Sequence, residues 1–308
     1  MSAWSSEEIR NELARVAPAR RCDRLAELSA LAHTAGRLHL LGHGKISLHL
    51  DVPSSAIARR AVGLLRDLGV ESEIRTYRQR AFSRPTRYQL HVAGSPAARR
   101  ILAESGIVSR AGAPLQLPPK RVVGKECCRA AYIRGALLGA GTVSGPRSPH
   151  LEIRCASLEA AELLVRLAAH DDVTLRARDR GRHAVAYAKG ADAIAETLAL
   201  AGASDAALLV DEHAVVGAAR AHANRLTNAD SANLIRASRA AHEQLRAVRR
   251  LAAEGKLESL PMQLREIADL RSRHPSLSLR ELAAKCRPPA TKAAAHRRLA
   301  RLRRLAEL

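Results

Sequence analysis

The hydrophobic positions in the first two thirds of the chain follow two different periods. A short acid-started helix is predicted within residues 1–21. From Cys22 to Gly36, apolar residues recur at the three- to four-residue spacing of a buried helix. The stretches that follow alternate apolar and polar side chains, as a β-hairpin does, with Gly42 and Gly44 at the turn. A helix, a second hairpin and another helix come next, giving the order helix-ββ-helix-ββ-helix.

The same order of elements begins again at Cys127, 105 residues after Cys22. At this offset the matching positions are Cys22 and Cys127, Leu28 and Ile133, Leu31 and Ala136, and Gly36 and Gly141. A recurring supersecondary unit indicates an internal repeat. We therefore predict an α+β domain over residues 22–210. It consists of two repeats (22–108 and 125–205) related by pseudo-twofold symmetry and joined by a linker rich in proline and glycine.

Strand patterns are missing from the last third of the chain, so residues 211–308 are predicted to form an all-α domain. A first helix runs through Val215 and leads to the segment NRLTNAD. A long helix is then predicted from about Asp230 to Glu254, where Gly255 ends it. A further helix ends before Pro275 because proline cannot continue it.

The end of the chain reads as a helix-turn-helix over residues 278–306. Ser278 and Glu281 fit a capping box, which fixes the start of the first helix. Two prolines force a turn, and Thr291 is a plausible cap for the last helix. On that helix the predicted core stripe is Ala295, Leu299, Leu302 and Ala306, and the opposite side carries Arg297, Arg301 and Arg304.

A basic outer face on the second helix is typical of helix-turn-helix proteins, in which this helix lies in the major groove. The predicted DNA contacts on it are Thr291, Lys292, His296, Arg297, Arg298 and Arg301. Residues early in the helix are expected to reach base edges, and Arg301, Arg303 and Arg304 to hold phosphates. The alternative is a solvated basic helix on an ordinary bundle.

The NRLTNAD segment is open to two interpretations. Asn224 and Arg225 are polar groups beside a predicted helix start, which is a common place for phosphate binding. Both are therefore added to the candidate DNA contacts. In the alternative interpretation the segment binds nothing, and Asn228 or Asp230 simply caps the long helix.

The charge of the chain supports a nucleic-acid partner. The formal net charge is +21, and from His213 onward there are 20 Lys and Arg against 8 Asp and Glu. Aromatic residues make up only 2% of the chain, which disfavours single-stranded binding by base stacking. Double-stranded DNA is the expected partner. A protein that binds nucleoid DNA or RNA without sequence preference is the alternative, and its affinity would collapse with salt.

The five cysteines favour a reduced, cytoplasmic protein, because they form no CxxC pair and neither a signal peptide nor a membrane-length apolar run is found. A metal site from Cys127, Cys128, Cys155 and His150 can be drawn. Adjacent cysteines on one helix point about 100° apart, however. The prediction is therefore no metal site and no cofactor.

The two repeat-opening helices resemble the LAGLIDADG helices of homing endonucleases. Leu28–Gly36 and Ile133–Gly141 keep the small residues and the terminal glycine of that motif. In the family, the acidic residue just before the glycine holds the catalytic metal. Here these positions are Ala35 and Ala140, and alanine supplies no oxygen ligand. No catalytic residues are therefore predicted, and an active nuclease is the least favoured alternative.

Taken together, the chain resembles the WhiA family of bacterial regulators. The most specific stretches are Ala131–Pro146, Asn224–Ser238 and Leu264–Ala283 with the HRRL that follows. The resemblance implies a degenerate LAGLIDADG-like domain joined to a helix-turn-helix akin to the promoter-reading region of sigma factors. It also implies control of cell division and sporulation genes.

The partners implied by this resemblance are promoter DNA, a WhiB-type iron–sulfur protein and RNA polymerase carrying a sigma factor. No membrane partner is expected, and the location implied is the cytoplasm, at the nucleoid. Pseudo-twofold symmetry within one chain removes the need for a homodimer, so a monomer is expected.

Overall fold

The computed structural model describes residues 5–40, 46–78, 86–145 and 149–307. Gly42 and Gly44, placed at a turn by the sequence pattern, lie outside these residues. Contacts divide the chain into two compact units, Met1–Gly217 and Ala218–Leu308. Within the described ranges, no helix combines the length and the apolar character needed to cross a membrane.

The first unit contains two copies of the order helix-ββ-helix-ββ-helix. Repeat one is α2 (Arg21–Ala35), β1 (Gly36–Leu40), β2 (Ile46–Val52), α3 (Ser55–Asp67), β3 (Glu73–Arg78), β4 (Thr86–Val92) and α4 (Pro96–Glu104). Repeat two is α6 (Glu126–Ala140), β5 (Gly141–Ser144), β6 (His150–Cys155), α7 (Leu158–Ala169), β7 (Arg176–Asp179), β8 (Ala184–Lys189) and α8 (Ala191–Ala201). The predicted α+β repeat is confirmed. Two further helices are α1 (Ser6–Arg15) and α5 (Lys120–Val123), the latter within the predicted linker.

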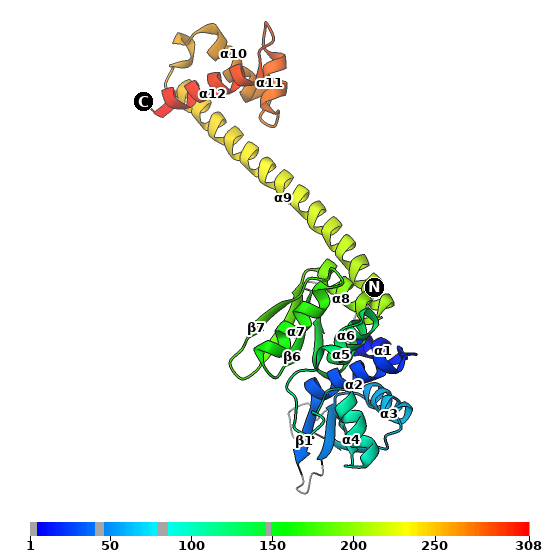
Figure 1. Cartoon of the computed structure of the whole chain (residues 1–308). Coiled ribbons are helices and arrows are strands. Elements are labelled where there is room, and N and C mark those ends of the chain that lie inside the picture. The colour runs from blue at the N-terminus through cyan, green and yellow to red at the C-terminus, as the bar shows by residue number, and fades with distance from the viewer. Residues whose placement is uncertain (1–4, 41–45, 79–85, 146–148, 308) are drawn as a thin grey trace. The chain divides into compact units, whose positions relative to one another are not determined.

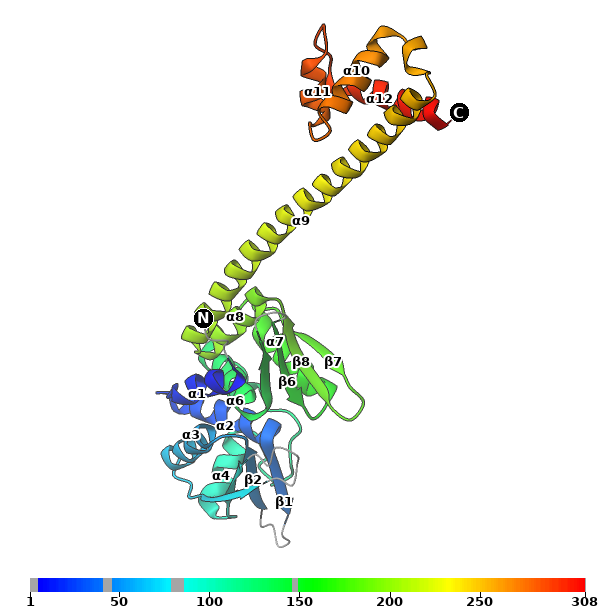
Figure 2. The same ribbon diagram turned by 180° about the vertical axis from the view of Figure 1, so that it is seen from behind.

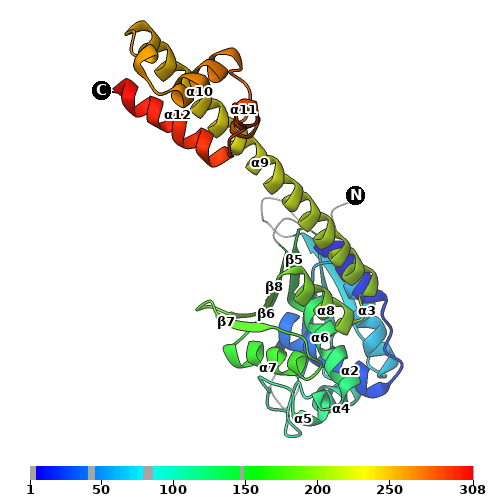
Figure 3. The ribbon, with the colours of Figure 1, turned by 90° about the horizontal axis from the view of Figure 1, so that it is seen from above.

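Each repeat forms its own antiparallel sheet, and the two sheets have the same strand order. The first sheet is ordered β1-β2-β4-β3 and the second β5-β6-β8-β7. Leu48, Leu50 and Val52 alternate along β2 and are buried beneath helices, as the period-two pattern requires. In the second repeat, α7 covers one face of the sheet (Figures 1 and 3).

Helices α2 and α6 form the centre of the first unit and lie between the two sheets (Figures 1 and 2). Leu28 and Ile133, which match at the repeat offset, are both fully buried. Close approach depends on glycine. A Cβ added to Gly135 would lie 2.4 Å from the carbonyl oxygen of Glu27 on the facing helix. The two backbones therefore touch with no room for a side chain between them.

A buried ion-pair network holds this helix pair together. The fully buried carboxylate of Glu27 accepts from Arg60 Nε of α3 at 2.7 Å and from Arg134 Nε of α6 at 2.9 Å. Arg134 also donates to the carbonyl of Ala201 at the end of α8, at 3.1 Å. Buried charges are tolerated when they are paired and hydrogen-bonded in this way. The network joins helices of both repeats.

The second unit is entirely helical in its described residues. It contains the last part of α9 (Ser204–Ala253), a short 3-10 turn (Leu257–Ser259), α10 (Met262–Arg273), α11 (Leu279–Lys285) and α12 (Lys292–Glu307). Its buried core is made of aliphatic and small residues: Ala247, Val248, Leu251, Leu264, Ile267, Ala268, Leu282, Ala283, Cys286, Ala295, Leu299, Leu302 and Ala306.

The predicted break at NRLTNAD is wrong, because α9 runs without interruption through this segment. Thr227 donates its hydroxyl to the carbonyl of Ala223 at 3.1 Å, so its side chain adapts to the helix and does not end it. No proline occurs between Ser204 and Ala253. Strong helix formers around the segment outweigh the weak preference of Asn, Thr and Asp for caps. The predicted stop is confirmed, because Gly255 adopts φ +69° just beyond the last turn.

Candidate nucleic-acid interface

Side-chain caps fix the N-terminal ends of helices α11 and α12. The backbone N–H of Glu281 donates to Ser278 Oγ at 3.3 Å, and the backbone N–H of Ser278 donates to Glu281 Oε2 at 2.8 Å. These bonds from Ser278 lower the pKa of the Glu281 carboxyl. Thr291 Oγ1 accepts from the backbone N–H of Ala294 at 3.1 Å, as a cap does. The predicted starts of both helices are confirmed.

Helix α12 packs through one narrow stripe. Ala295, Leu299, Leu302 and Ala306 are all buried, the first two completely. This stripe is the one that the sequence predicts, and α10 and α11 cover it. Most of the predicted DNA contacts lie outside it and are exposed: Thr291, Lys292, His296, Arg297 and Arg301. The helix therefore presents a basic surface to solvent.

Two arginines of α12 are engaged by the protein itself. Arg298, a predicted DNA contact, is only 20% exposed and lies 4.0 Å from Glu266 of α10. Arg303 Nη1 pairs with Glu243 of α9 at 2.8 Å. Sequence patterns do not reveal these partners, since both lie far away along the chain. Arg297, Arg301 and Arg304 are exposed instead, and within the described ranges none of them takes part in a salt bridge.

A buried arginine that the sequence analysis did not identify holds the segment between α10 and α11 in place. Arg271 of α10 is 2% exposed, and its Nη1 donates to the carbonyls of Pro275 at 3.2 Å and Leu277 at 2.7 Å. Burial lowers the pKa of this guanidinium from its usual value. These bonds hold the segment between α10 and α11, so Arg271 is a structural and not a DNA-facing group.

Asn224 and Arg225 are exposed on α9, but no helix begins there. The proposed anion site at a helix start is therefore a wrong prediction, because its free N–H groups are used by the continuing helix. Asn228 and Asp230 likewise cap nothing at this point of the chain. Contact of Asn224 and Arg225 with DNA stays a prediction that rests on exposure alone.

The positions that would hold a catalytic metal in a homing endonuclease lie at the ends of the central helices. Ala35 is the last residue of α2, and Ala140 is the last residue of α6. A methyl group at each position offers no ligand to a cation. A Cβ added to Gly36 or Gly141 would lie 2.3 or 2.5 Å from a carbonyl oxygen of its own helix, which accounts for the glycines.

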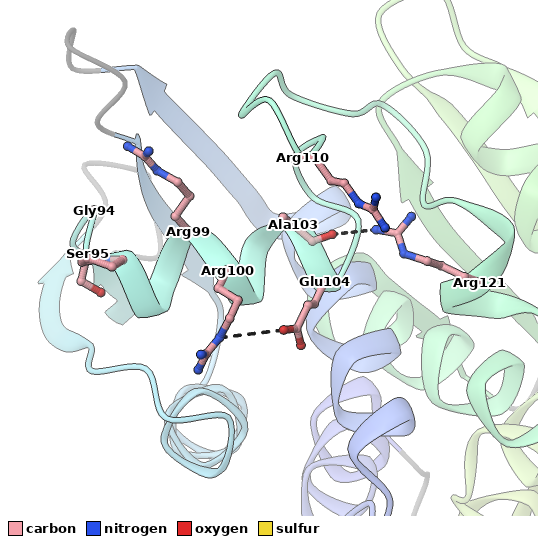
Figure 4. A pocket seen from close by; sticks show the side chains of 9 residues that line it. Gly94, Ser95, Arg99, Arg100, Ala103, Glu104, Arg110 and Arg121 are labelled. Atoms are coloured by element: carbon pink, nitrogen blue, oxygen red, sulfur yellow. Dashed lines mark hydrogen bonds and ion pairs between the residues drawn. The ribbon is translucent and has the colours of Figure 1, made fainter.

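Two polar surface features in or beside repeat one were not singled out by the sequence pattern. The first is a hollow lined by Arg99, Arg100 and Glu104 of α4 together with Arg110 and Arg121 of the linker (Figure 4). Within it Arg121 Nη2 donates to the Ala103 carbonyl at 2.8 Å. Part of its positive charge is therefore already engaged by the protein.

The second feature is a row of histidines across the first sheet. The ring centroids of His39 and His49 are 4.2 Å apart, and those of His49 and His91 are 4.6 Å apart. Partial burial, with the neighbouring histidines, lowers the pKa of His49. His49 therefore carries less positive charge near neutral pH than an isolated histidine would.

Comparisons with known proteins cover almost the whole chain. Family profiles match at residues 21–108 (WhiA N-terminal LAGLIDADG-like domain), 129–220 (WhiA LAGLIDADG-like domain) and 223–306 (WhiA C-terminal HTH domain). A probable cell division protein WhiA of Symbiobacterium thermophilum is 35% identical over 301 residues, covering 97% of this chain and 96% of the relative. The corresponding protein of Corynebacterium urealyticum is 38% identical and covers 97% and 91%.

Solved structures agree at the level of the fold. The crystal structure of full-length DUF199/WhiA from Thermotoga maritima matches with a TM-score of 0.58 at 22% identity, covering 99% of this chain and 98% of that one. The N-terminal LAGLIDADG domain of DUF199/WhiA matches with a TM-score of 0.51 at 19% identity, over 64% of this chain and 89% of that one.

Proposed function

The chain belongs to the WhiA family, and we propose that it is a sequence-specific transcription regulator of cell division genes that reads promoter DNA through α12. The observation that carries this proposal is the division of α12 into two faces. One face is a buried stripe and the other is an exposed basic surface. A helix fixed along one side and basic on the other suits insertion into the major groove.

In this proposal, different parts of α12 have different tasks. Lys292, His296 and Arg297 lie in its first two turns, where a recognition helix reaches base edges. Arg301 and Arg304 follow further along and are suited to phosphates, together with Thr291 at the cap. Arg298 is directed toward Glu266, so its share is expected to be the smallest of the predicted contacts on α12. Asn224 and Arg225 are assigned to the phosphate backbone.

We assign no catalytic activity to the LAGLIDADG-like domain. Alanine at both metal-holding positions supports an auxiliary role as a DNA or protein interface. The proposal extends to sporulation genes in filamentous actinobacteria, and to partnership at promoters with a WhiB-type iron–sulfur protein and sigma-containing RNA polymerase. It places a monomer at the nucleoid in the cytoplasm.

The proposal is tested by genome-wide DNA occupancy of the wild type beside an Arg297→Ala/Arg301→Ala variant. Both residues are exposed, so the substitutions are expected to leave the fold intact. Sharp peaks that share a motif and vanish in the variant are the expected result. Diffuse occupancy in both proteins would instead favour charge-driven binding without sequence preference.

A matched control removes the same charge from another helix. Arg246 and Arg249 are exposed near the end of α9, and their double alanine variant also loses two positive charges. Retention of the peaks in this control would tie recognition to α12 and not to net charge. Incubation of the bound DNA with Mg²⁺ and Mn²⁺ tests for cleavage, and specific cutting would contradict the proposed absence of catalysis.

A further inference from the structure

Four side chains capable of binding a metal meet where α2 and α6 begin. They are Cys22 and Asp23 of α2 and Cys127 and Cys128 of α6, and their ligand atoms all lie within 4.8 Å of one another. The four positions are related by the repeat, because Cys22 matches Cys127 and Asp23 matches Cys128. Each repeat therefore contributes two ligands, and these occupy equivalent positions in the two repeats.

The grouping differs from the metal site considered from sequence. That site joined Cys127 and Cys128 to Cys155 and His150, which lie in β6 and are not part of the group. It was disfavoured because adjacent cysteines diverge around a helix. In the structure the sulfurs of Cys127 and Cys128 lie 4.0 Å apart at the first turn of α6, and α2 supplies the other two ligand atoms of the group.

The separations fit a tetrahedral site. With Zn–S bonds of about 2.3 Å, the sulfurs of such a site lie about 3.8 Å apart, and a shorter Zn–O bond brings sulfur and oxygen slightly closer. Here Asp23 Oδ1 lies 3.3 Å from Cys22 Sγ and 3.6 Å from Cys128 Sγ. Closing the widest separation, 4.8 Å, requires a movement of only about 1 Å.

The carboxylate of Asp23 has no salt bridge within the 4.0 Å limit among the residues that the structure describes. Asp23 is 9% exposed and accepts hydrogen bonds there from the thiols of Cys22 and Cys128. A neighbouring cation is Arg20, whose pKa is raised by Cys127, Asp23 and Cys22. Buried carboxylates are ordinarily paired with a cation or bound to a metal. A metal ion among the four ligands would bind this carboxylate directly, which Arg20 does not do at salt-bridge distance.

The surrounding helices favour anionic ligands. Neither α2 nor α6 has a side-chain cap, so their first N–H groups are left free of such a partner. The positive ends of both helix dipoles converge on the ligands, which occupy the second and third positions of each helix. Burial acts in the opposite direction and raises the pKa of the Cys22 and Cys128 thiols, so these thiols are expected to lose their protons only when an ion binds. Cys128 is buried, whereas Cys22 and Cys127 are half-buried and leave a path for an ion to enter.

From this geometry we propose that Cys22, Asp23, Cys127 and Cys128 form a Zn²⁺ site that clasps the two repeats together. Three thiolates and one carboxylate in tetrahedral arrangement are suited to Zn²⁺. On binding, the three thiols lose three protons to solvent, and no oxidation or reduction takes place. Because two ligands come from each repeat, the ion stabilises the α2–α6 interface.

The test uses the full-length protein, reduced, stripped with a chelator and then reloaded with Zn²⁺ or Co²⁺. Wild type is expected to retain one equivalent of Zn²⁺ after gel filtration. With Co²⁺ it should show thiolate-to-metal charge transfer and visible d–d bands of tetrahedral intensity. Its Tm is expected to rise by about 5 °C or more on Zn²⁺ loading, because the ion binds the folded state.

A Cys22→Ser/Cys127→Ser variant removes the two half-buried ligands and is expected to lose all three signals. An Asp23→Asn variant keeps the thiols and should bind Zn²⁺ at least tenfold more weakly. Cys155→Ser, which removes a thiol outside the group, is the matched control and should behave as wild type. Comparing all variants in the metal-free state shows whether each one folds, separately from metal uptake.

The proposal is overturned if reduced wild type retains no more Zn²⁺ than the double variant. It is also overturned if bound Co²⁺ shows no thiolate charge transfer. A disulfide between Cys22 and Cys127 that persists in reductant and blocks uptake would assign the cysteines to oxidation and not to metal binding.

Discussion

Two pairs of helices lie in the LAGLIDADG-like part and in the HTH part of this chain, and they differ in what they leave exposed. In α2 and α6, residues on all sides are buried, and a fully buried carboxylate is held by two arginines of other helices. In α11 and α12, only one stripe of the second helix is buried, and its other sides carry exposed basic residues.

The difference separates a pair of helices that serves packing from a pair that leaves one side to solvent. The ends of α2 and α6 carry alanine, and their backbones are in close contact at Gly135. Substitutions in this pair should therefore change stability. Substitutions on the exposed side of α12 should change DNA affinity and leave stability alone.

The strongest test of this difference is Glu27→Gln, which leaves Arg60 and Arg134 buried without a counter-charge. Breaking a buried ion pair from one side costs about 3–5 kcal/mol. We expect the free energy of unfolding to fall by this amount in chemical denaturation. The control is Glu104→Gln, which removes a pair with the half-exposed Arg21 and should cost less than about 1 kcal/mol. Equal losses in the two variants would refute the structural role of Glu27.

A smaller effect is expected from Gly135→Ala. The added Cβ would meet the Glu27 carbonyl oxygen at 2.4 Å, a backbone atom that cannot rotate away. Overpacking of this kind costs about 1–3 kcal/mol, measurable as a lower Tm. Gly63→Ala in α3 is the control, because a Cβ there meets nothing within 4 Å. It should stabilise the protein by about 0.5–1 kcal/mol, and destabilisation by both variants would contradict the close contact at Gly135.

On α12, Arg297→Ala is expected to weaken specific DNA binding by about 10- to 100-fold and to relax sequence preference, with unchanged Tm. Fluorescence anisotropy with a bound promoter fragment measures the affinity. Arg303→Ala removes the same charge from the same helix, but this residue is already paired with Glu243. Its effect should be several-fold smaller. A larger loss in Arg303→Ala would place the reading face on the wrong side of α12.

The smallest expected effect is a pH dependence of stability from His33. This residue lies near the end of α2, and burial lowers the pKa of its imidazole. Below the ordinary histidine pKa of about 6.5, the unfolded chain binds a proton that the folded protein does not, so stability falls as pH decreases. His33→Gln should flatten this slope between about pH 6.5 and 5 in denaturant titrations. His170→Gln, at an exposed position, should leave the slope unchanged.

Local sequence signals predicted the features that depend on neighbouring residues. The repeat was visible because cysteine and glycine recur at one offset with apolar residues matched between them, and α2 and α6 begin and end at matching positions. The caps of α11 and α12 were visible because Ser278, Glu281 and Thr291 act within four residues of themselves. The buried stripe of α12 followed from its period.

Features that depend on distant residues could not be found in this way. The inward direction of Arg298 is set by Glu266, which belongs to another helix. The grouping of Cys22 and Asp23 with Cys127 and Cys128 requires both repeats to be folded together. The continuity of α9 through Asn224 was missed for a different reason. Cap-forming residues were read as a break, although helix formers surround them.

The two repeats are joined in one polypeptide, and this has a consequence for how their surfaces can change. In a pair of identical subunits every substitution occurs twice, and the pair separates on dilution. In a fused pair each substitution occurs once, and the linker sets the effective concentration at which the two halves meet. Each half can therefore diverge alone. Repeat one holds Asp51 between Tyr77 and Arg87, while repeat two joins Glu152 to His150 and Arg180. The two sheets of a fused duplication can therefore differ, and contact a partner that has no twofold symmetry, while the α2–α6 pair at the centre keeps its symmetry.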